Sequence, residues 1–207
     1  MKLIDITQTY RPGMIRYRSI EDFHFEWLRH YSQGSGMALS KFSMTSHLGT
    51  HIDSPYHFIE GGKKIGDITL ETLCGKAQVI NACNRTVIDR DFLESQKITA
   101  PRLLFKTDNT ERLRNTADFD NVFFTEDTGE YLAVHGVILV GFDYFNVDKR
   151  GDKSRRAHRS LLSKNIVILE AVFLDGVSSG EYDLYCLPLK LDDLEGAPCR
   201  VILQEGE

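Results

Sequence analysis

The chain of 207 residues lacks several features that would assign it to a specialised class of protein. No run of about 18 apolar residues occurs, so no membrane span is expected. The segment from Met1 to Thr7 contains an acid and no long apolar run, so we expect a cytoplasmic protein without a signal peptide. The net charge is -5 and no continuous basic patch is visible, which argues against nucleic acid as a partner.

Cysteine is also sparse. The four cysteines lie far apart in the sequence and form no CxxC pair, which excludes a zinc ribbon. In a cytoplasmic chain we expect them to be small buried hydrophobic residues, and nothing in the neighbouring sequence favours a cysteine nucleophile. They are Cys74, Cys83, Cys186 and Cys199.

Short apolar runs rich in β-branched and aromatic residues recur along the chain and predict strands of four to six residues. No linker, internal repeat or low-complexity segment separates them, so residues 1–207 are predicted to form a single domain. Its expected class is mixed α/β or α+β, dominated by sheet. The predicted strands are Leu3–Ile6, Gln78–Asn81, Leu103–Lys106, Val122–Phe124, Val137–Phe142, Ile166–Leu169, Tyr182–Leu187 and Arg200–Leu203.

Helical patterns are few and short. Asp89–Glu94 opens with acids, as a first helical turn prefers. Glu126–His135 is the clearer helix, with Thr125 as its N-cap and Gly136 as its end. His135 falls in the last turn, where a cation is favoured, so we expect it to cap the helix and not to bind a metal.

Residues 8–38 resist assignment to regular structure. They are rich in aromatic residues and contain Pro12 and several glycines. A long aromatic connection of this kind is typical of a binding loop or a dimer arm. The alternative, a loop packed on its own core, is equally compatible with the sequence.

The densest concentration of metal-binding side chains lies in residues 47–57, His-Leu-Gly-Thr-His-Ile-Asp-Ser-Pro-Tyr-His, which hold three of the seven histidines. Neutral imidazole is the commonest protein ligand for metals, and a neighbouring carboxylate supplies charge that holds a divalent cation. Gly49 and Pro55 interrupt any regular helix, so we expect a tight loop that brings His47, His51 and Asp53 to one point.

One loop rarely supplies every ligand of a cation. Glu170 ends the apolar run Ile166–Leu169, and a carboxylate in such a strand costs several kcal/mol unless it is paired or bound to metal. His158 lies upstream, just before Arg159 and the apolar pair Leu161-Leu162, and is a second candidate. Asp143 ends another apolar run, and we interpret it as structural.

The stretch from His47 to Phe58 resembles the signature HxGTHxDxPxHF of the cyclase family, which includes bacterial kynurenine formamidases (arylformamidases) and isatin hydrolases. It matches at every defined position. The likeness continues at Gly141-Phe-Asp143, His158–Leu162, Ile166–Glu170, Leu187–Leu191 and Gly196–Arg200, so it covers nearly the whole chain.

The resemblance implies a swivelling β/β/α fold, a homodimer, a small-molecule substrate and one or two divalent metal ions, Zn²⁺ or Mn²⁺. Carried over to this sequence, His47, His51 and Asp53 bind the first metal. Asp53 bridges to a second metal that His158 and Glu170 hold. His57 matches the family's catalytic histidine.

The segment near the N-terminus departs from the family. Kynurenine formamidases carry a substrate-contacting tryptophan in a Val-Trp-Pro-Gly-Asp stretch, and the matching position here is Tyr17, flanked by Arg16 and Arg18. We therefore expect Tyr17 to contact substrate. The two arginines either favour a more anionic substrate than formylkynurenine or point to solvent.

The sequence thus predicts a metal-dependent hydrolase of a small, cyclic or N-formyl aryl amide, in which the metal activates water and His57 is the general base. Two alternatives remain at this stage. One is a metal-assisted cyclase or dehydratase, and the other is a non-catalytic module that binds a metal or a ligand through the same loop.

Overall fold

The computed structural model describes residues 2–116 and 119–206. Strands make up most of its regular structure, in agreement with the sheet-dominated class predicted from the sequence. In chain order they are β1 (Leu3–Asp5), β2 (His24–Arg29), β3 (Leu39–Ser43), β4 (His51–Asp53), β5 (Cys74–Asn81), β6 (Val87–Ile88), β7 (Arg102–Lys106), β8 (Phe123–Phe124), β9 (Leu139–Phe142), β10 (Val167–Glu170), β11 (Gly180–Pro188) and β12 (Gly196–Glu205).

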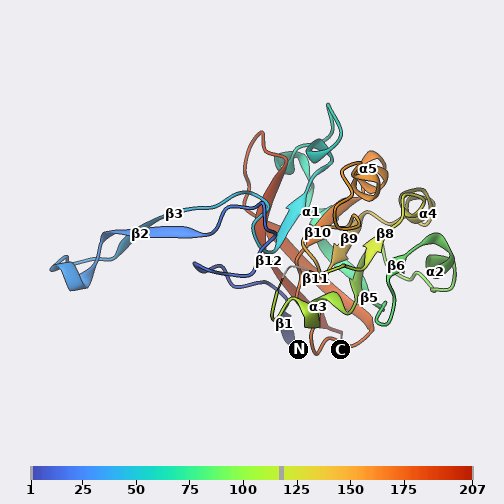
Figure 1. The fold of residues 1–207 in the computed structure, drawn as a ribbon, viewed down its shortest axis with the longest axis horizontal. Helices are drawn as coiled ribbons and strands as arrows, with labels where there is room; N and C mark the ends of the chain where they lie inside the picture. The colour runs from blue at the N-terminus through green and yellow to red at the C-terminus, as the bar shows by residue number, and fades with distance from the viewer. Residues whose placement is uncertain (1, 117–118, 207) are drawn as a thin grey trace.

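Eight of these strands form one sheet in the order β1-β12-β11-β5-β7-β9-β10-β4 (Figure 1). The sheet closes on itself because β4 pairs with β10 along one edge and with β12 along the other. The pairs among β5, β7, β9 and β10 are parallel, whereas β1, β4, β11 and β12 pair antiparallel. The result is a barrel-like sheet, and the mixed α/β class is confirmed.

The helices are short and lie mainly on the outer side of this sheet, where α2, α4 and α5 pack side by side (Figure 1). None of the helices in the described part of the chain has the length and apolar character needed to cross a bilayer. The α-helices are α1 (Leu70–Leu73), α2 (Arg90–Glu94), α3 (Asn109–Arg112), α4 (Thr128–Val134) and α5 (Arg156–Ser163), and the 3-10 turns are η1 (Tyr31–Gln33), η2 (Pro55–His57) and η3 (Ile65–Asp67).

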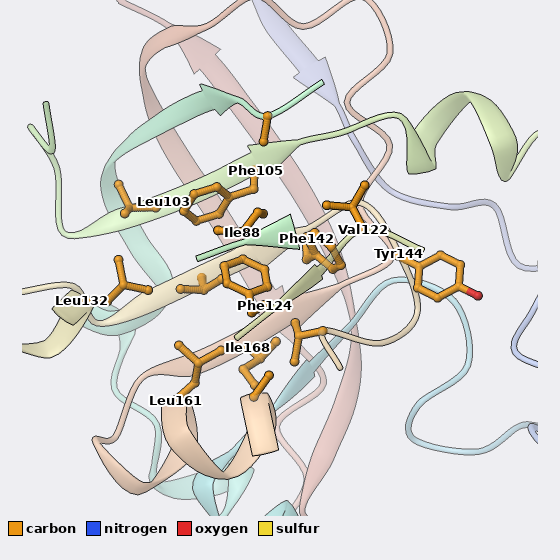
Figure 2. Close-up of a cluster of buried hydrophobic side chains, with 14 of the residues drawn as sticks. Ile88, Leu103, Phe105, Val122, Phe124, Leu132, Phe142, Tyr144, Leu161 and Ile168 are labelled. Carbon is orange, nitrogen blue, oxygen red and sulfur yellow. The ribbon is translucent and has the colours of Figure 1, made fainter. Parts of the chain in front are cut away.

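Two apolar clusters fill the two faces of the sheet. Side chains alternate along β7, so that Leu103 and Phe105 point to the helices while Leu104 points into the closed sheet. Figure 2 shows the outer cluster, in which Leu161 of α5 and Ile168 of β10 come together. Burial on both faces explains why these strands read as continuous apolar runs in the sequence.

The predicted helices are largely confirmed, with one correction. The Asp89 carboxylate accepts a hydrogen bond from the Phe92 N–H at 2.9 Å and so caps α2. His135 caps the end of α4, as expected, because its Nδ1 donates to the Tyr131 carbonyl at 2.8 Å. The prediction of Thr125 as the N-cap of this helix was wrong, because α4 begins two residues later and its N-cap is Asp127.

Part of the unassigned aromatic segment forms a two-stranded hairpin, β2 and β3, that extends away from the body of the molecule (Figure 1). Every residue of both strands is exposed. The segment before it packs on the core instead: Met14 is buried and the Tyr10 hydroxyl donates to the Thr50 carbonyl. The segment before the hairpin is therefore packed on the core, whereas the role of the hairpin as a binding loop or a dimer arm stays a prediction.

Asp143 has the structural role predicted for it. Its buried carboxylate accepts hydrogen bonds from the backbone and side chain of Thr107, at 2.8 and 2.7 Å, and from the Thr110 hydroxyl at 2.8 Å. These bonds join the end of β9 to the start of α3. Although the donors favour the charged form, burial raises the pKa of this carboxyl to about 6.

Candidate metal centre

The register of β4 places two of the predicted ligands on one face of the sheet. His51 and Asp53 alternate with Ile52, whose side chain lies inside the closed sheet. In the antiparallel pair with β10, His51 lies opposite Glu170. Residues separated by more than a hundred positions in the chain are therefore cross-strand neighbours.

The loop before β4 is held in a tight conformation. Gly49 has a φ of +62°, and a Cβ at this position would lie 3.0 Å from the side chains of Met14 and Tyr10. The Thr50 hydroxyl donates to the Ala171 carbonyl at 2.7 Å, which ties the loop to the end of β10. A tight loop is thus present before β4, but the prediction was wrong for His51 and Asp53, which lie on strand β4 and not in the loop.

Asp53 lies at the centre of the site. Its Oδ1 is 2.8 Å from His47 Nδ1 and 3.2 Å from His51 Nε2. Its Oδ2 is 3.4 Å from Nε2 of His158, on the far side of the carboxylate. The two oxygens thus face different histidines, which is the arrangement that a carboxylate shared between two cations requires.

His158 and Glu170 complete the cluster. His158 is buried on α5, the helix that packs on β10, and its Nε2 lies 3.3 Å from Glu170 Oε1. The same oxygen accepts a hydrogen bond from the Val147 N–H at 2.9 Å. The other oxygen of Glu170 lies 3.6 Å from His51 Nε2.

The charges in the site are strongly coupled. Burial opposes charge on His47, but Asp53 outweighs it and raises the pKa of His47 to about 9, so a cation that binds Nδ1 displaces a proton at neutral pH. Burial likewise opposes ionisation of Asp53, yet the surrounding histidines hold the pKa of its carboxyl well below its usual range. Burial alone would lower the pKa of His158. The carboxylates of Asp148, Asp53 and Glu170 outweigh it and raise this pKa well above its usual range, and the hydrogen bond to Asp148 is the largest single contribution among them.

The residues present fit a divalent cation. His51 Nε2 and both carboxylate oxygens of Asp53 are buried without a hydrogen-bond partner in the described part of the chain. A buried carboxylate without donors costs several kcal/mol unless a cation compensates it. Imidazole nitrogens and carboxylate oxygens are the ligands that zinc takes in proteins, and carboxylates also suit manganese.

His57 lies at the edge of the cluster, at the end of η2, which begins at Pro55. Its ring centroid is 4.2 Å from that of His47 and 5.9 Å from that of His158. Burial, aided by the neighbouring charged histidines and opposed by Asp53, lowers the pKa of His57 to about 4. A nitrogen of His57 also lies within 4.8 Å of ligand atoms of His47 and Asp53, so the geometry is compatible with a base or a ligand.

Tyr17 is half-buried and packs against the same apolar cluster as Phe58, the residue after His57. Burial, with smaller contributions from Tyr17 and Glu170, raises the pKa of the neighbouring Tyr144 to about 12. Arg16 folds back on its own loop, where Nε donates to the Ile20 carbonyl at 3.0 Å and the guanidinium lies 3.7 Å from the Asp22 carboxylate. Arg18 is exposed.

Two acids that contact the predicted ligands were missed in the sequence. Asp148 Oδ2 lies 2.5 Å from His158 Nδ1, and Glu195 Oε1 lies 3.0 Å from His47 Nε2. Asp148 begins a run of mixed charge and Glu195 follows other acids, so both read as solvated surface. The one available signal for Asp148 is that it follows Val147 within a mostly apolar stretch.

A family model described as "Putative cyclase" matches residues 4–149 of the chain. The kynurenine formamidase of Bacillus anthracis is 32% identical over 204 residues, which cover 98% of this chain and 97% of that protein. The kynurenine formamidase of Erythrobacter litoralis is 34% identical over 209 residues, covering 99% and 94% of the two chains. The chain belongs to the cyclase family.

Solved structures of the cyclase family share this fold. A potential metal-dependent hydrolase with cyclase activity superposes with a TM-score of 0.86 at 29% identity, over 100% of this chain and 98% of that one. Isatin hydrolase A from Ralstonia solanacearum gives a TM-score of 0.84 at 26% identity, over 99% and 92%. The family and fold expected from the resemblance are confirmed, and the chain is an enzyme of this family.

Proposed function

We propose that this protein is a metal-dependent hydrolase that cleaves the carbon–nitrogen bond of a small amide. The observation that carries the proposal is the buried Asp53 carboxylate, whose two oxygens form no well-aligned hydrogen bond in the described part of the chain and lie against histidine nitrogens on both sides. Relatives of similar length are kynurenine formamidases, and a structural neighbour is an isatin hydrolase. These names support an N-formyl aryl amide or a cyclic aryl amide as the substrate class.

In this proposal His47, His51 and Asp53 hold one divalent ion, and Asp53 shares a second ion with His158 and Glu170. The distances around Asp53 support this division, because Oδ1 faces the first pair of histidines and Oδ2 faces His158. A divalent ion in such a site lowers the pKa of water and polarises a carbonyl oxygen. Zinc and manganese both suit this donor set.

His57 is proposed to move the proton during hydrolysis. It accepts a proton from the attacking water and delivers it to the leaving nitrogen as the carbon–nitrogen bond breaks, which yields a carboxylic acid and an amine. Its lowered pKa keeps the imidazole neutral at pH 7, so the ring has a free lone pair for the proton, while the same lowering makes it a weaker base than an ordinary histidine.

The direct test is a substrate panel with defined metals. We expect the protein, stripped with chelator and reloaded with zinc or manganese, to hydrolyse N-formyl anilines, isatin or small cyclic amides, and the stripped protein to be inactive. Product acid and amine are measured by chromatography. Metal binding without turnover of any amide, or turnover that persists after chelation, would contradict the proposal.

Tyr17 is proposed to contribute to substrate binding and not to the chemical step. Tyr17→Ala should raise KM several-fold while kcat stays near the original value, because loss of uniform binding acts on KM alone. The matched control is Arg18→Ala, which removes an exposed neighbour and should leave KM for neutral substrates unchanged. A collapse of kcat with unchanged KM in Tyr17→Ala would place this segment in the catalytic machinery.

We further propose that the β2–β3 hairpin is covered by a second copy of the chain in a homodimer. The hairpin exposes seven large apolar side chains, and an isolated two-stranded ribbon is marginally stable in water. Side chains of this size offer on the order of 100 Å² each, close to the roughly 800 Å² that a stable interface buries per partner. They are Phe25, Trp27, Leu28, Tyr31, Met37, Leu39 and Phe42.

Replacing Trp27 and Phe42 with serine should therefore convert the dimer to a monomer, measured by sedimentation equilibrium. The side chains of Trp27 and Phe42 are 46% and 56% exposed. Leu70→Ser is the control, because Leu70 is 64% exposed on α1, outside the hairpin. A wild-type protein that sediments as a monomer, or a double variant that remains dimeric, would contradict this assignment.

A further inference from the structure

Glu195, in the loop that precedes β12, contacts both ends of the segment 46–54, which contains His47, His51 and Asp53. Glu195 Oε1 lies 3.0 Å from His47 Nε2 and accepts a hydrogen bond from the Ser46 hydroxyl at 2.6 Å. The carbonyl of Glu195 accepts hydrogen bonds from the Ser54 N–H at 2.9 Å and the Ser54 hydroxyl at 2.8 Å. One residue outside the proposed ligand set thus holds His47 and the start of the turn that carries His57.

Glu195 lies beside the nitrogen of His47 that does not contact Asp53. Neutral imidazole carries one proton, and an acceptor beside one nitrogen holds the proton there and leaves the other lone pair for a cation. His51 and His158 have their acceptors at Nδ1, the Gly49 carbonyl at 2.8 Å and Asp148 at 2.5 Å, and both present Nε2. His47 is reversed, because its acceptor lies at Nε2 and its Nδ1 lies 2.8 Å from Asp53.

The residue after Glu195 supports the same orientation. A Cβ at Gly196 would lie 2.8 Å from the Ile52 carbonyl oxygen and 3.0 Å from His47 Cε1. The imidazole of His47 therefore packs directly against this backbone, with no room for a side chain between them. The position requires glycine for space, and the close packing keeps the ring facing both carboxylates.

We propose that Glu195 is a positioning residue that fixes the His47 ring so that Nδ1 binds the metal. The proposal rests on the proposed function, since it requires that the site hold a divalent ion. Outer carboxylates of this kind change metal affinity by about 10- to 100-fold when removed. The effect of Glu195 is therefore expected in metal affinity, through His47.

Substitution of Glu195 by glutamine separates the effect of its hydrogen bonds from the effect of its negative charge. Both side-chain contacts of Glu195 use Oε1, so Glu195→Gln keeps the acceptor for Ser46 and His47 and loses only the charge, whereas Glu195→Ala loses both contacts. The Glu195 side chain is 32% exposed, so both variants should fold. The control is Asp193→Ala, two residues away, whose carboxylate is 76% exposed and pairs with Lys64.

Zinc affinity is measured by chelator competition on the full-length protein. Glu195→Ala should weaken zinc binding by about 10- to 100-fold, Glu195→Gln by less than about 10-fold, and Asp193→Ala should not change it. In ¹⁵N-labelled, zinc-loaded protein, NMR should detect a protected His47 Nε2–H in the wild type and in Glu195→Gln. This signal should be lost in Glu195→Ala.

Three results would overturn the positioning role while leaving the proposed function intact. They are wild-type zinc affinity in Glu195→Ala, a loss in Glu195→Gln as large as in Glu195→Ala, and a zinc-bound His47 protonated at Nδ1. Failure of the wild-type protein to bind zinc or manganese would instead overturn the proposed function itself.

Discussion

Replacing Asp53 with alanine should remove bound metal and hydrolytic activity together. Its carboxylate is buried, and its two oxygens face His47 and His51 on one side and His158 on the other. Removing a shared carboxylate weakens both proposed positions at once, so the loss of affinity should exceed the roughly 100-fold limit for an outer residue. Metal content by elemental analysis and turnover on the amide panel measure the two losses.

A second buried aspartate provides the matched control. Asp143 is equally buried, but Thr107 and Thr110 satisfy its oxygens. Asp143→Asn should destabilise the fold by about 1–3 kcal/mol, because donors lose a charged acceptor, and should retain metal. Full metal occupancy in Asp53→Ala would exclude Asp53 as a shared ligand, and equal metal loss in both variants would indicate a general effect of folding.

The candidate site was largely predictable because its chemistry is concentrated in the sequence. His47, His51, Asp53 and His57 lie within eleven residues, and the structure brings them together as expected. Glu170 was identifiable because a carboxylate at the end of a buried apolar strand needs a partner. His158 became a specific candidate through the resemblance, and it lies 3.3 Å from Glu170.

Other parts could not be predicted because no local pattern marks them. β4 has three residues, too few to show alternation. In β2 the alternation His24-Phe25-Glu26-Trp27 stops at Leu28, which is too short a run to predict a strand, and every residue of both hairpin strands is exposed. Glu195 follows other acids in a stretch that reads as surface charge, and its contact with His47 spans 148 positions. Such contacts arise only when the sheet closes.

His57→Ala should lose most turnover while keeping its metal. A general base contributes about 10²- to 10⁴-fold, so kcat should fall by this factor. The lowered pKa of His57, about 4, means that the imidazole is neutral and able to accept a proton throughout the neutral range. In the wild type, protonation of His57 should therefore not reduce kcat until the pH falls below about 5. The fall in kcat should come as the pH approaches 4, because protonation removes the base.

His135→Ala serves as the matched control, since His135 caps α4 outside the site and its loss should not change kcat. Metal content is measured at each pH, because protons compete with metal for His47, whose pKa is raised to about 9. Comparison with His51→Ala separates the two roles that the geometry allows for His57. If His57→Ala loses metal as completely as His51→Ala, then His57 is a ligand in the cluster with His47 and Asp53, and another group must be the base.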